Sequence, residues 1–351
     1  MKLTRLAVAG VLAVVALVVP TAAGATTARA EPPMRSLAGA AGTGFGTAVD
    51  AAALRTDAAY RARIAREFST VTAENAMKWE SIEPTRGTYR WTDSDELLAF
   101  ARQHRMRVRG HTLVWHNQLP AWLTGGTFTN SELRQILRQH ITAEVRHFRG
   151  RVWHWDVVNE AFDEDGTLRD TVWLRALGPD YLADAFRWAH AADPTARLFY
   201  NDYNIEAVGP KSDAVYALVK RLRAEGVPIH GVGFQGHETV SWAPPTLRAN
   251  LARFDALGVR TAITEADVRM TLPADGTKLQ AQAAGFSALL NACLLTRRCE
   301  SFTLWGFTDR YSWVPGWFAG QGAATPLDQN LAPKPAWSAM REDLALAGAA
   351  R

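Results

Sequence analysis

Glu160 and Glu265 are the two residues whose type and placement could do chemistry. Each directly follows a strongly apolar stretch, and about 100 residues separate them. Cleavage of a glycosidic bond needs such a pair, because one carboxyl group must be protonated to assist the leaving oxygen while the other is ionised. A shared buried setting pushes the two pKa values apart and so separates the two roles. A single Glu at a strand end would more simply form a salt bridge or a loop hydrogen bond.

Other polar and aromatic residues share this position at the end of an apolar run. In a barrel of parallel strands the active site lies at the carboxyl ends of the strands, so these side chains would converge on one mouth. Such convergence is typical of a binding site. The residues are Glu74, Asn75, Lys78, His111, Trp115, His116, Asn159, Asn201, Asp202, Tyr203, Gln235, His237, Asp267, Trp305, Asp309 and Trp313.

An alternation of short apolar runs and longer amphipathic segments predicts the elements that position these residues. Eight strands joined by helices in one unit of this length predict an α/β fold, a single-domain (β/α)8 TIM barrel. The rival is an open doubly wound sheet, but no Gly-x-Gly-x-x-Gly loop follows the first strand. We expect strands at 44–49, 69–73, 107–111, 152–158, 197–200, 231–234, 260–264 and 301–305, and helices at 93–103, 130–148, 180–192, 211–224, 246–257 and 278–295.

Residues 1–30 have the order of a secretory signal peptide: a positive start, an apolar run and a small-residue end at Ala28-Arg29-Ala30. The apolar run of about 14 residues is short for a membrane span of about 20, so we expect a secreted, extracellular protein with no membrane contact in its mature form. Residues 31–42 are expected to be a short lead-in. No Pro/Ser/Thr-rich linker follows, which predicts one domain without an accessory module.

The charge balance argues against a nucleic-acid partner. Of 39 basic side chains, Lys2, Arg5 and Arg29 lie in the leader, so 36 face 35 acidic ones in the rest of the chain. No run of basic residues suggests nucleic acid, and a neutral polysaccharide fits this balance better. Cys293 and Cys299 lie six positions apart in an exported chain, which favours a local disulfide over two buried free thiols.

Five motifs carry a resemblance to a known family. They are Thr70-Val-Thr-Ala-Glu-Asn-Ala-Met-Lys-Trp79, Gly110-His-Thr-Leu-Val-Trp-His116, Trp155-Asp-Val-Val-Asn-Glu160, Gly233-Phe-Gln-Gly-His237 and Ile263-Thr-Glu-Ala-Asp267. In this order, each at the end of an expected strand, they resemble the family 10 glycoside hydrolases, the barrel endo-1,4-β-xylanases. The resemblance covers about residues 38 to 342 and implies a catalytic barrel over 43–345, with xylan and xylo-oligosaccharides as substrates and no cofactor or metal.

The resemblance also implies roles in a retaining double displacement. Glu160 would be the general acid/base and Glu265 the nucleophile, with carboxyl groups about 5 to 5.5 Å apart. His237 and Asp267 would form a hydrogen-bonded chain that orients Glu265 and keeps it ionised. Asn159 would bind the sugar 2-hydroxyl beside the cleaved bond.

Further residues are implied to line the substrate subsites. Lys78, His111 and Gln235 would contact hydroxyls of the same sugar, and Glu74 and Asn75 the next sugar on the nonreducing side. Flat aromatic faces pack on the apolar faces of sugar rings. The aromatic residues that match the family are Trp115, Trp305, Trp313 and Tyr203, whereas Trp79, Trp153, Trp155, Trp173 and Trp188 are expected to be structural.

The resemblance also implies which residues set substrate specificity, and some residues depart from the family pattern. Trp305 and Trp313 would close the wall beside the carbon that carries a hydroxymethyl group in glucose but not in xylose. The pair Cys293 and Cys299 resembles the local disulfide of the family and would fasten the scaffold under Trp305. Ala266, Glu238-Thr239 and Trp317 depart from the family pattern, and Trp317 could narrow or extend the cleft.

Three other functions remain open at this level. An endoglucanase or mixed β-glycanase would use the same two glutamates with different subsite walls. An inactive carbohydrate-binding barrel is opposed by the presence of both Glu160 and Glu265. A metal-dependent hydrolase is opposed by the lack of a His-Glu-x-x-His motif or a comparable short spacing. A monomer is the default expectation for the assembly.

Overall fold

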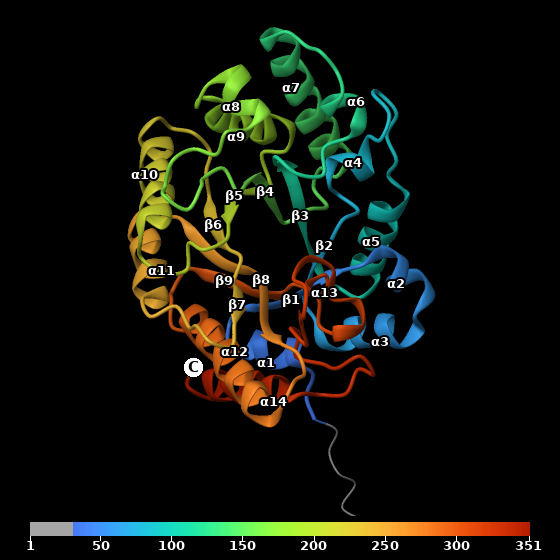
Figure 1. Ribbon diagram of the computed structural model, residues 1–351, viewed down its shortest axis with the longest axis vertical. Helices are drawn as coiled ribbons and strands as arrows, with labels where there is room; N and C mark the ends of the chain where they lie inside the picture. The colour runs from blue at the N-terminus through green and yellow to red at the C-terminus, as the bar shows by residue number, and fades with distance from the viewer. Residues whose placement is uncertain (1–30) are drawn as a thin grey trace, which may run out of the picture. The chain divides into compact units, whose positions relative to one another are not determined.

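The apolar runs form the strands of a closed parallel barrel in the computed structural model, which describes residues 31–351 (Figure 1). The order of pairing is β1-β2-β3-β4-β5-β6-β8-β9, and β9 pairs back to β1 to close the ring. The predicted (β/α)8 TIM barrel is therefore confirmed. The barrel strands are β1 Gly44–Val49, β2 Thr70–Ala73, β3 Arg107–Val114, β4 His154–Asn159, β5 Arg197–Asp202, β6 Gly231–Phe234, β8 Arg260–Thr271 and β9 Cys299–Leu304.

Strand β8 runs well beyond its predicted end at residue 264. Past Glu265 it pairs with β7 (His237–Thr239), where His237 lies opposite Asp267, and with β10 (Gln321–Gly322), where Gln321 lies opposite Thr271. Both partners come from distant parts of the chain, so the local apolar pattern could not indicate them. The extension carries Asp267 and Arg269 above the barrel on the same side of the strand as Glu265, since alternate residues of a strand share a face.

The six long helices predicted between the strands are all present, with ends shifted by at most two residues. The long helix α7 begins at Asn130 because Thr129 caps it, in a capping box with Glu132. The other helices are mostly short turns between strand ends. The helices are α1 Met34–Ala40, α2 Ala51–Thr56, α3 Ala58–Glu67, α4 Trp79–Ile82, α5 Thr92–Gln103, α6 Ala121–Thr124, α7 Asn130–His147, α8 Val172–Leu177, α9 Tyr181–Ala192, α10 Pro210–Ala224, α11 Leu247–Ala256, α12 Gly276–Leu294, α13 Val314–Trp317 and α14 Pro335–Ala349.

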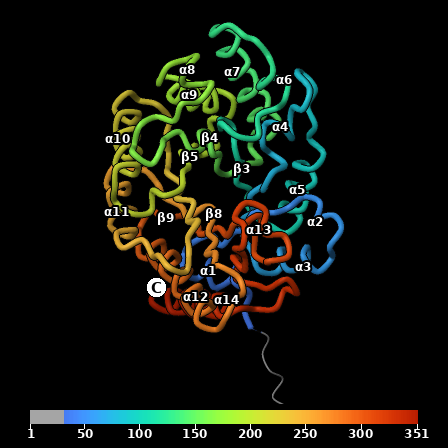
Figure 2. The backbone as a smooth tube through the Cα atoms, in the orientation of Figure 1, coloured from blue at the N-terminus to red at the C-terminus, as the bar shows by residue number. Residues whose placement is uncertain are grey.

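Residues 31–42, expected as a short lead-in, include the helix α1. Its Met34 and Ala38 are fully buried, and the Met34 amide donates a hydrogen bond to Glu67. Helix α1 packs against the last helix, α14, so the two ends of residues 33–351 lie side by side beneath the barrel (Figure 2). The lead-in is thus part of the packed structure.

A glycine permits close packing between strands β3 and β4 of the barrel. A Cβ atom at Gly110 would lie 2.3 Å from the ring of Trp155, which is itself fully buried on the neighbouring strand β4. Any larger residue at 110 would push Trp155 out of place. Gly110 directly precedes His111, so this packing also fixes the strand that delivers His111 to the barrel mouth.

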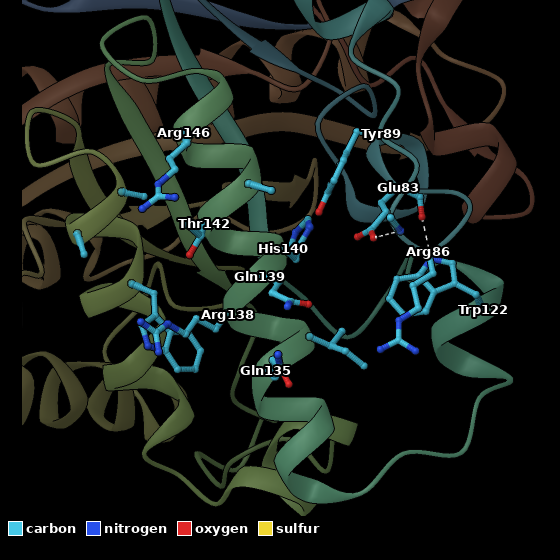
Figure 3. Close-up of a pocket in the computed structure, with 16 residues that line it drawn as sticks. Glu83, Arg86, Tyr89, Trp122, Gln135, Arg138, Gln139, His140, Thr142 and Arg146 are labelled. Carbon is cyan, nitrogen blue, oxygen red and sulfur yellow. Dashed lines mark hydrogen bonds between the residues drawn. The ribbon is translucent and has the colours of Figure 1, made fainter.

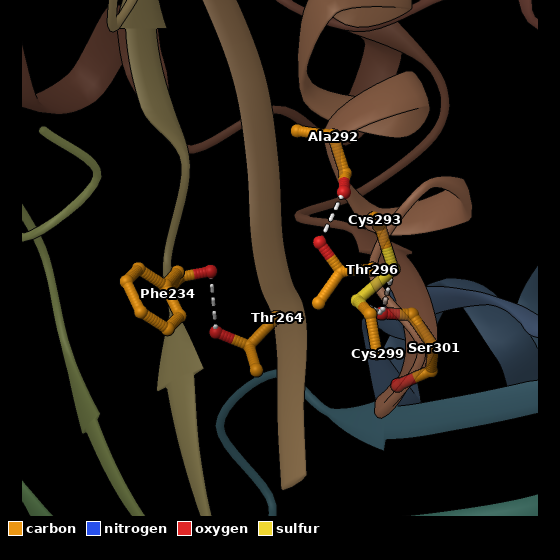
Figure 4. The surroundings of a disulfide bond; sticks show 7 residues. All are labelled: Phe234, Thr264, Ala292, Cys293, Thr296, Cys299 and Ser301. Atoms are coloured by element: carbon orange, nitrogen blue, oxygen red, sulfur yellow. Dashed lines mark hydrogen bonds between the residues drawn. A yellow bond between two sulfur atoms is a disulfide. The ribbon is translucent and has the colours of Figure 1, made fainter. Parts of the chain in front are cut away.

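A disulfide joins Cys293, near the end of α12, to Cys299, the first residue of β9, as the sequence predicts (Figure 4). Between them the Thr296 hydroxyl donates to the Ala292 carbonyl and closes the turn. The bond therefore fixes the connection that leads into the strand preceding Trp305.

Replacing both cysteines by serine should lower the free energy of unfolding by about 2 kcal/mol, since a closed loop this short removes about that much chain entropy from the unfolded state. We expect the melting temperature to fall by a few degrees. The kcat at 25 °C should not change, because the disulfide lies outside the catalytic pocket. Circular dichroism melts of the double variant check this. An unchanged melting temperature, or a loss of activity at 25 °C, would contradict it.

The predicted signal peptide, residues 1–30, lies outside the described residues. Within residues 31–351 no helix is both long enough and apolar enough to cross a membrane.

Candidate active site

A pocket of about 640 Å³ opens at the carboxyl ends of the barrel strands. Every catalytic or substrate-binding residue that the family resemblance implies lines it except Asp267, which lies behind His237. Residues from all parts of the chain therefore meet at one mouth. The lining is Glu74, Asn75, Lys78, His111, Trp115, His116, Asn117, Gln118, Asn159, Glu160, Arg169, Tyr203, Asn204, Gln235, His237, Glu265, Arg269, Trp305, Trp313, Trp317 and Phe318.

Glu160 follows the last residue of β4 and receives hydrogen bonds from neutral donors. Trp115 Nε1 donates to Oε2 at 2.8 Å, while Asn159 Nδ2 and Gln235 Nε2 donate to Oε1 at 3.0 and 3.1 Å. The backbone φ of Glu160 is 58°, a left-handed conformation that is uncommon for a residue with a side chain. Strained backbone of this kind persists where the surrounding structure holds it, often at functional sites.

Glu265 lies on β8 and is almost completely buried, with 4% of its surface exposed. Asn201 Nδ2 donates to Oε1 at 2.7 Å, and His237 Nε2 lies 3.2 Å from Oε2. Burial raises the pKa of Glu265, but the nearby His111 and His237 outweigh burial and hold this pKa below its usual value. The Glu265 side chain is therefore a carboxylate at neutral pH.

The two glutamates are linked by a short chain of amides. Asn201 Nδ2 donates both to Glu265 and to Asn159 Oδ1, at 2.7 and 2.8 Å, and Asn159 in turn donates to Glu160. The carboxyl groups thus belong to one hydrogen-bonded network. The separation of 5 to 5.5 Å between them stays a prediction.

His237 lies between two carboxylates. Its Nδ1 is 3.0 Å from Asp267 Oδ2, and the same oxygen accepts a hydrogen bond from Trp313 Nε1 at 2.8 Å. Burial lowers the pKa of His237, but Asp267 and Glu265 outweigh burial and raise the pKa to about 10. His237 is therefore a cation beside Glu265 at neutral pH.

The ion pairs of His237 make the stability of the protein depend on pH. A folded-state pKa of about 10 means that His237 contributes its full stabilisation below the unfolded value of about 6.5 and loses it as the pH rises towards 10. Replacing His237 by Asn should therefore cost about 3 kcal/mol of stability near pH 6, because it leaves buried charge unpaired. The cost should shrink as the pH approaches 10. Thermal melts of both proteins from pH 6 to 10 check this, and a difference that stays constant over the range would contradict it.

A buried chain of charged and polar side chains runs from the catalytic pocket through the barrel interior. His111 Nδ1 lies 3.0 Å from Asp156 Oδ2, and Asp156 forms a bidentate ion pair with Arg109, with Nε to Oδ2 at 2.9 Å. Arg109 lies 3.4 Å from His154, and His154 Nε2 lies 3.1 Å from Glu300. The strand-end pattern in the sequence does not indicate Arg109 or Asp156 as site residues. The available signal was the period of two, which puts Arg109 with His111 and His154 with Asp156 on the inner face of their strands.

Replacing Asp156 by Asn should lower kcat roughly ten- to a hundredfold with little change in KM, because a small displacement of a group beside the reacting atoms can cost about that much. The asparagine would leave Arg109 without its carboxylate and His111 without its anionic acceptor. Steady-state kinetics on xylo-oligosaccharides check this, with Asp170→Asn, an exposed site, as the matched control. A variant in which KM changes and kcat does not would contradict a positioning role for Asp156.

Lys78 lies on the same side of the pocket as Glu74 and Asn75. Its Nζ donates to Asn75 Oδ1 at 2.9 Å and to Gln118 Oε1 at 2.7 Å, and it lies 5.1 Å from the Trp115 ring centroid. Burial raises the pKa of Glu74 to about 7. This end of the pocket therefore offers hydrogen-bond donors and acceptors that are held in place by one another. Gln118, which comes from a loop, was not found by the sequence analysis.

Tryptophans enclose the pocket around Glu265. Trp305 is nearly buried and packs edge-on against His111 at 5.2 Å, and Trp313 packs against His237 at 5.1 Å. The ring centroid of Trp317 lies 6.2 Å from that of Trp313, but Trp317 is 70% exposed and therefore lies at the rim of the pocket. Tryptophan side chains therefore form one wall of the pocket beside Glu265, and Trp317 extends this wall to the solvent-exposed rim.

Tyr203 and Arg169 form the other rim, next to Glu160. Arg169 donates to the Tyr203 hydroxyl and to the Glu160 carbonyl, both at 3.0 Å, and Lys211 Nζ lies 3.5 Å above the Tyr203 ring. Arg169 follows an irregular segment rather than a strand, so strand-end reasoning could not find it. Two residues of the predicted polar set lie elsewhere: Asp309 pairs with Lys334, and Asp202 with Lys211 and the Tyr200 hydroxyl.

Within residues 31–351 no three His, Cys, Asp or Glu side chains are grouped so as to hold a metal ion. His111 and Glu265, which the metal-dependent alternative would use, are instead 3.8 Å apart and paired with Asp156 and His237 respectively.

Comparisons with known proteins agree on one family. The family model described as glycosyl hydrolase family 10 matches residues 34–343. An endo-1,4-β-xylanase of Agaricus bisporus is 46% identical over 295 residues, covering 84% of this chain and 88% of its own. Endo-1,4-β-xylanase B of Thermotoga neapolitana is 46% identical over 281 residues, covering 79% of this chain and 81% of its own.

Solved structures give the same result. The crystal structure of native xylanase 10B from Thermotoga maritima superposes with a TM-score of 0.89 at 43% identity, covering 91% of this chain and all of that one. Xylanase 10B from Thermotoga petrophila, solved in complex with xylobiose, superposes with a TM-score of 0.88 at 43% identity, covering 90% of this chain and 98% of that one.

Proposed function

The chain belongs to glycosyl hydrolase family 10 and is an endo-1,4-β-xylanase, and from this premise we propose that it cleaves internal xylosidic bonds of xylan by a retaining double displacement. Glu265 is the nucleophile and Glu160 the general acid/base. One observation carries the assignment: Glu265 lies 3.2 Å from a protonated His237, whereas the hydrogen bonds to the Glu160 carboxyl in the described structure come from the neutral donors Trp115, Asn159 and Gln235.

In the first step Glu265 attacks the anomeric carbon while Glu160 transfers its proton to the leaving oxygen. The C–O bond to the leaving sugar breaks as the bond to the Glu265 oxygen forms, and the proton from Glu160 neutralises the departing alkoxide. His237, Asn201 and His111 hold Glu265 in one orientation, so the enzyme attacks along a fixed direction. Asp267 and Trp313 in turn fix His237.

In the second step Glu160, now ionised, removes a proton from water, and the water oxygen displaces Glu265 from the anomeric carbon. Two inversions at that carbon restore the original β configuration. In this proposal Asn159 Nδ2 donates to the sugar 2-hydroxyl when substrate is bound. It would give up its hydrogen bond to Glu160 for this contact, which strengthens as the transition state forms.

Xylan rather than cellulose is favoured by the wall of the pocket. Trp305 is nearly buried between His111 and His237, so it cannot easily move aside for the extra hydroxymethyl group of glucose. The relative from Thermotoga petrophila was solved with xylobiose, which supports the same substrate class. An endoglucanase remains the second candidate on this barrel.

Proton NMR of the first products tests substrate and mechanism together. With unsubstituted xylan we expect short xylo-oligosaccharides whose new reducing ends appear first as the β-anomer. Carboxymethyl cellulose should give no comparable products. The α-anomer as first product would overturn the retaining mechanism, and cleavage of cellulose at a similar rate would overturn the xylan assignment.

Secretion is proposed from residues 1–30. Lys2 and Arg5 precede an apolar run, and the small residues that end at Ala30 are typical of a cleavage site. N-terminal sequencing of the protein recovered from culture medium should begin at Glu31. Activity retained inside the cell, with Lys2 still present in the isolated protein, would contradict secretion by this route.

A further inference from the structure

A second cavity lies on the outer side of the barrel, over helix α7 (Figure 3). Its volume is about 730 Å³, larger than the catalytic pocket, and the two share no lining residue. The walls come from α7, from the loop after α4, from α6 and from the end of α9. The cavity is therefore a separate feature of the molecule, without a role in the mechanism above.

Helix α7 contributes a polar stripe to this cavity. Gln135, Arg138, Gln139, Thr142 and Arg146 recur every three or four residues, which puts them on one face of the helix. At a rise of 1.5 Å per residue, Arg138 and Arg146 are about 12 Å apart along the axis. The opposite face of α7 packs on the barrel. The stripe thus presents two arginines that are about two helical turns apart.

The arginines of the cavity lack acidic partners. Within residues 31–351 no carboxylate pairs with Arg86, Arg138 or Arg146, although Arg134 on the same helix pairs with Asp184. The single acidic residue in the lining is Glu83, which is 5% exposed and already accepts hydrogen bonds from Trp79 Nε1 and the Gly87 amide. The cavity therefore carries an excess of positive charge that is open to a ligand.

Neither acidic residue of α7 forms an ion pair with these arginines: Glu144 is fully buried, 3.4 Å from His140, and the other is Glu132. Its carboxylate accepts from the Thr129 amide and hydroxyl at 2.7 and 2.8 Å in the capping box. In a different basic cavity, near the disulfide, most of the lining arginines are paired: Arg298 and Arg297 contact Asp255 at 2.9 and 3.9 Å, and Arg260 pairs with Glu300. The cavity over α7 differs because, within residues 31–351, none of its three lining arginines is paired with a carboxylate.

Partly exposed aromatic rings flank the same arginines. Trp122 is held by a hydrogen bond from its Nε1 to the Glu83 carbonyl at 2.9 Å, and Arg86 lies 5.7 Å from its ring. Trp188 lines the other flank, and Tyr89 stacks on Trp91 at 5.1 Å. Rings held in place in this way can pack on the apolar faces of sugars at low entropic cost.

From this combination we propose that the cavity over α7 is a second carbohydrate-binding site, which binds xylan segments that carry uronic acid side groups. The carboxylates of the side groups pair with Arg138 and Arg146, for which planar bidentate contacts are favoured. The sugar rings pack on Trp188 and Trp122, and Gln135, Gln139 and Thr142 supply hydrogen bonds to hydroxyls. The choice of xylan as the chain rests on the proposed function. Such a site would hold the polymer on the enzyme between cleavage events.

Binding can be separated from hydrolysis in a Glu265→Gln background. We expect Arg138→Gln/Arg146→Gln to weaken retention by immobilised glucuronoxylan at least fivefold, and retention by unsubstituted xylan less than twofold. The exposed pair Arg102→Gln/Arg248→Gln, with the same change in net charge, should have no effect. In the otherwise wild-type enzyme the double variant should leave kcat/KM on an aryl xylobioside unchanged, since that substrate fits within the catalytic pocket.

Three outcomes would overturn the proposal. Equal weakening by the cavity variant and the control variant would mean a general charge effect. Retention of both xylans to the same extent would remove the role of the uronate. Oligogalacturonate binding as strongly as the glucuronic acid-substituted xylan would mean a site for any polyanion. A wild-type enzyme without activity on the aryl xylobioside would instead refute the proposed function, and the binding comparison would still be readable.

Discussion

Glu265→Gln should reduce kcat on xylan by roughly 10⁴-fold or more, because the amide cannot form the glycosyl–enzyme bond. The substitution keeps the shape of the side chain, so Asn201 and His237 stay packed around it. KM should change much less than kcat. Initial rates of reducing-sugar release from xylan, with the wild type alongside, check this.

The control for Glu265→Gln is Glu225→Gln at the exposed end of α10, which should behave as the wild type. Circular dichroism should give the same spectrum for all three proteins. Residual activity within a hundredfold of the wild type would mean that Glu265 only assists, and the nucleophile would have to be sought elsewhere in the pocket.

Glu160→Ala should slow the first step of the reaction only for substrates whose leaving group needs a proton, and should slow the second step for all substrates. On xylan the loss in kcat should be about 10³- to 10⁴-fold, since the departing sugar alkoxide needs a proton. A dinitrophenyl xylobioside needs no proton, so Glu265 should still displace its phenolate. The second step also loses its base and becomes slow. We therefore expect a rapid burst of phenolate followed by slow turnover, observable by stopped-flow absorbance.

A different pattern would remove Glu160 from the acid/base role. Equal losses on xylan and on the activated xylobioside, without a burst, would mean that Glu160 acts mainly in binding. Asn159→Ala serves as the matched comparison, because it alters the same corner of the pocket and leaves the carboxyl in place. This variant should lower kcat/KM on both substrates and produce no burst of phenolate.

Much of the barrel could be predicted from the chain because local apolar runs determine where strands start. Strands β1 and β6 have the predicted limits. Glu160 directly follows β4, and Glu265 lies where the barrel part of β8 ends, so both stand where catalytic residues of a barrel are expected. Strand β8 was predicted too short because its outer part is held by β7 and β10, which pair with it from elsewhere in the chain.

The parts of the site that escaped prediction depend on contacts between distant residues. Arg109 and Asp156 sit within apolar strands, and only the closed barrel makes them neighbours of His111. Arg169 and Gln118 come from loops whose paths are set by the elements they cross. The Arg138 and Arg146 stripe has a readable helical spacing, but the lack of acidic partners depends on what packs beside α7.

Trapping the covalent intermediate tests the central claim most directly. A 2-deoxy-2-fluoro xylobioside with a dinitrophenolate leaving group should react once and stay attached. The fluorine slows both displacements, whereas the good leaving group accelerates only the first, so the covalent intermediate accumulates. The account predicts one added disaccharide by intact mass, located by peptide mapping on Glu265. An enzyme that turns over xylan but gives no adduct, or an adduct on another residue, would contradict a double displacement through Glu265.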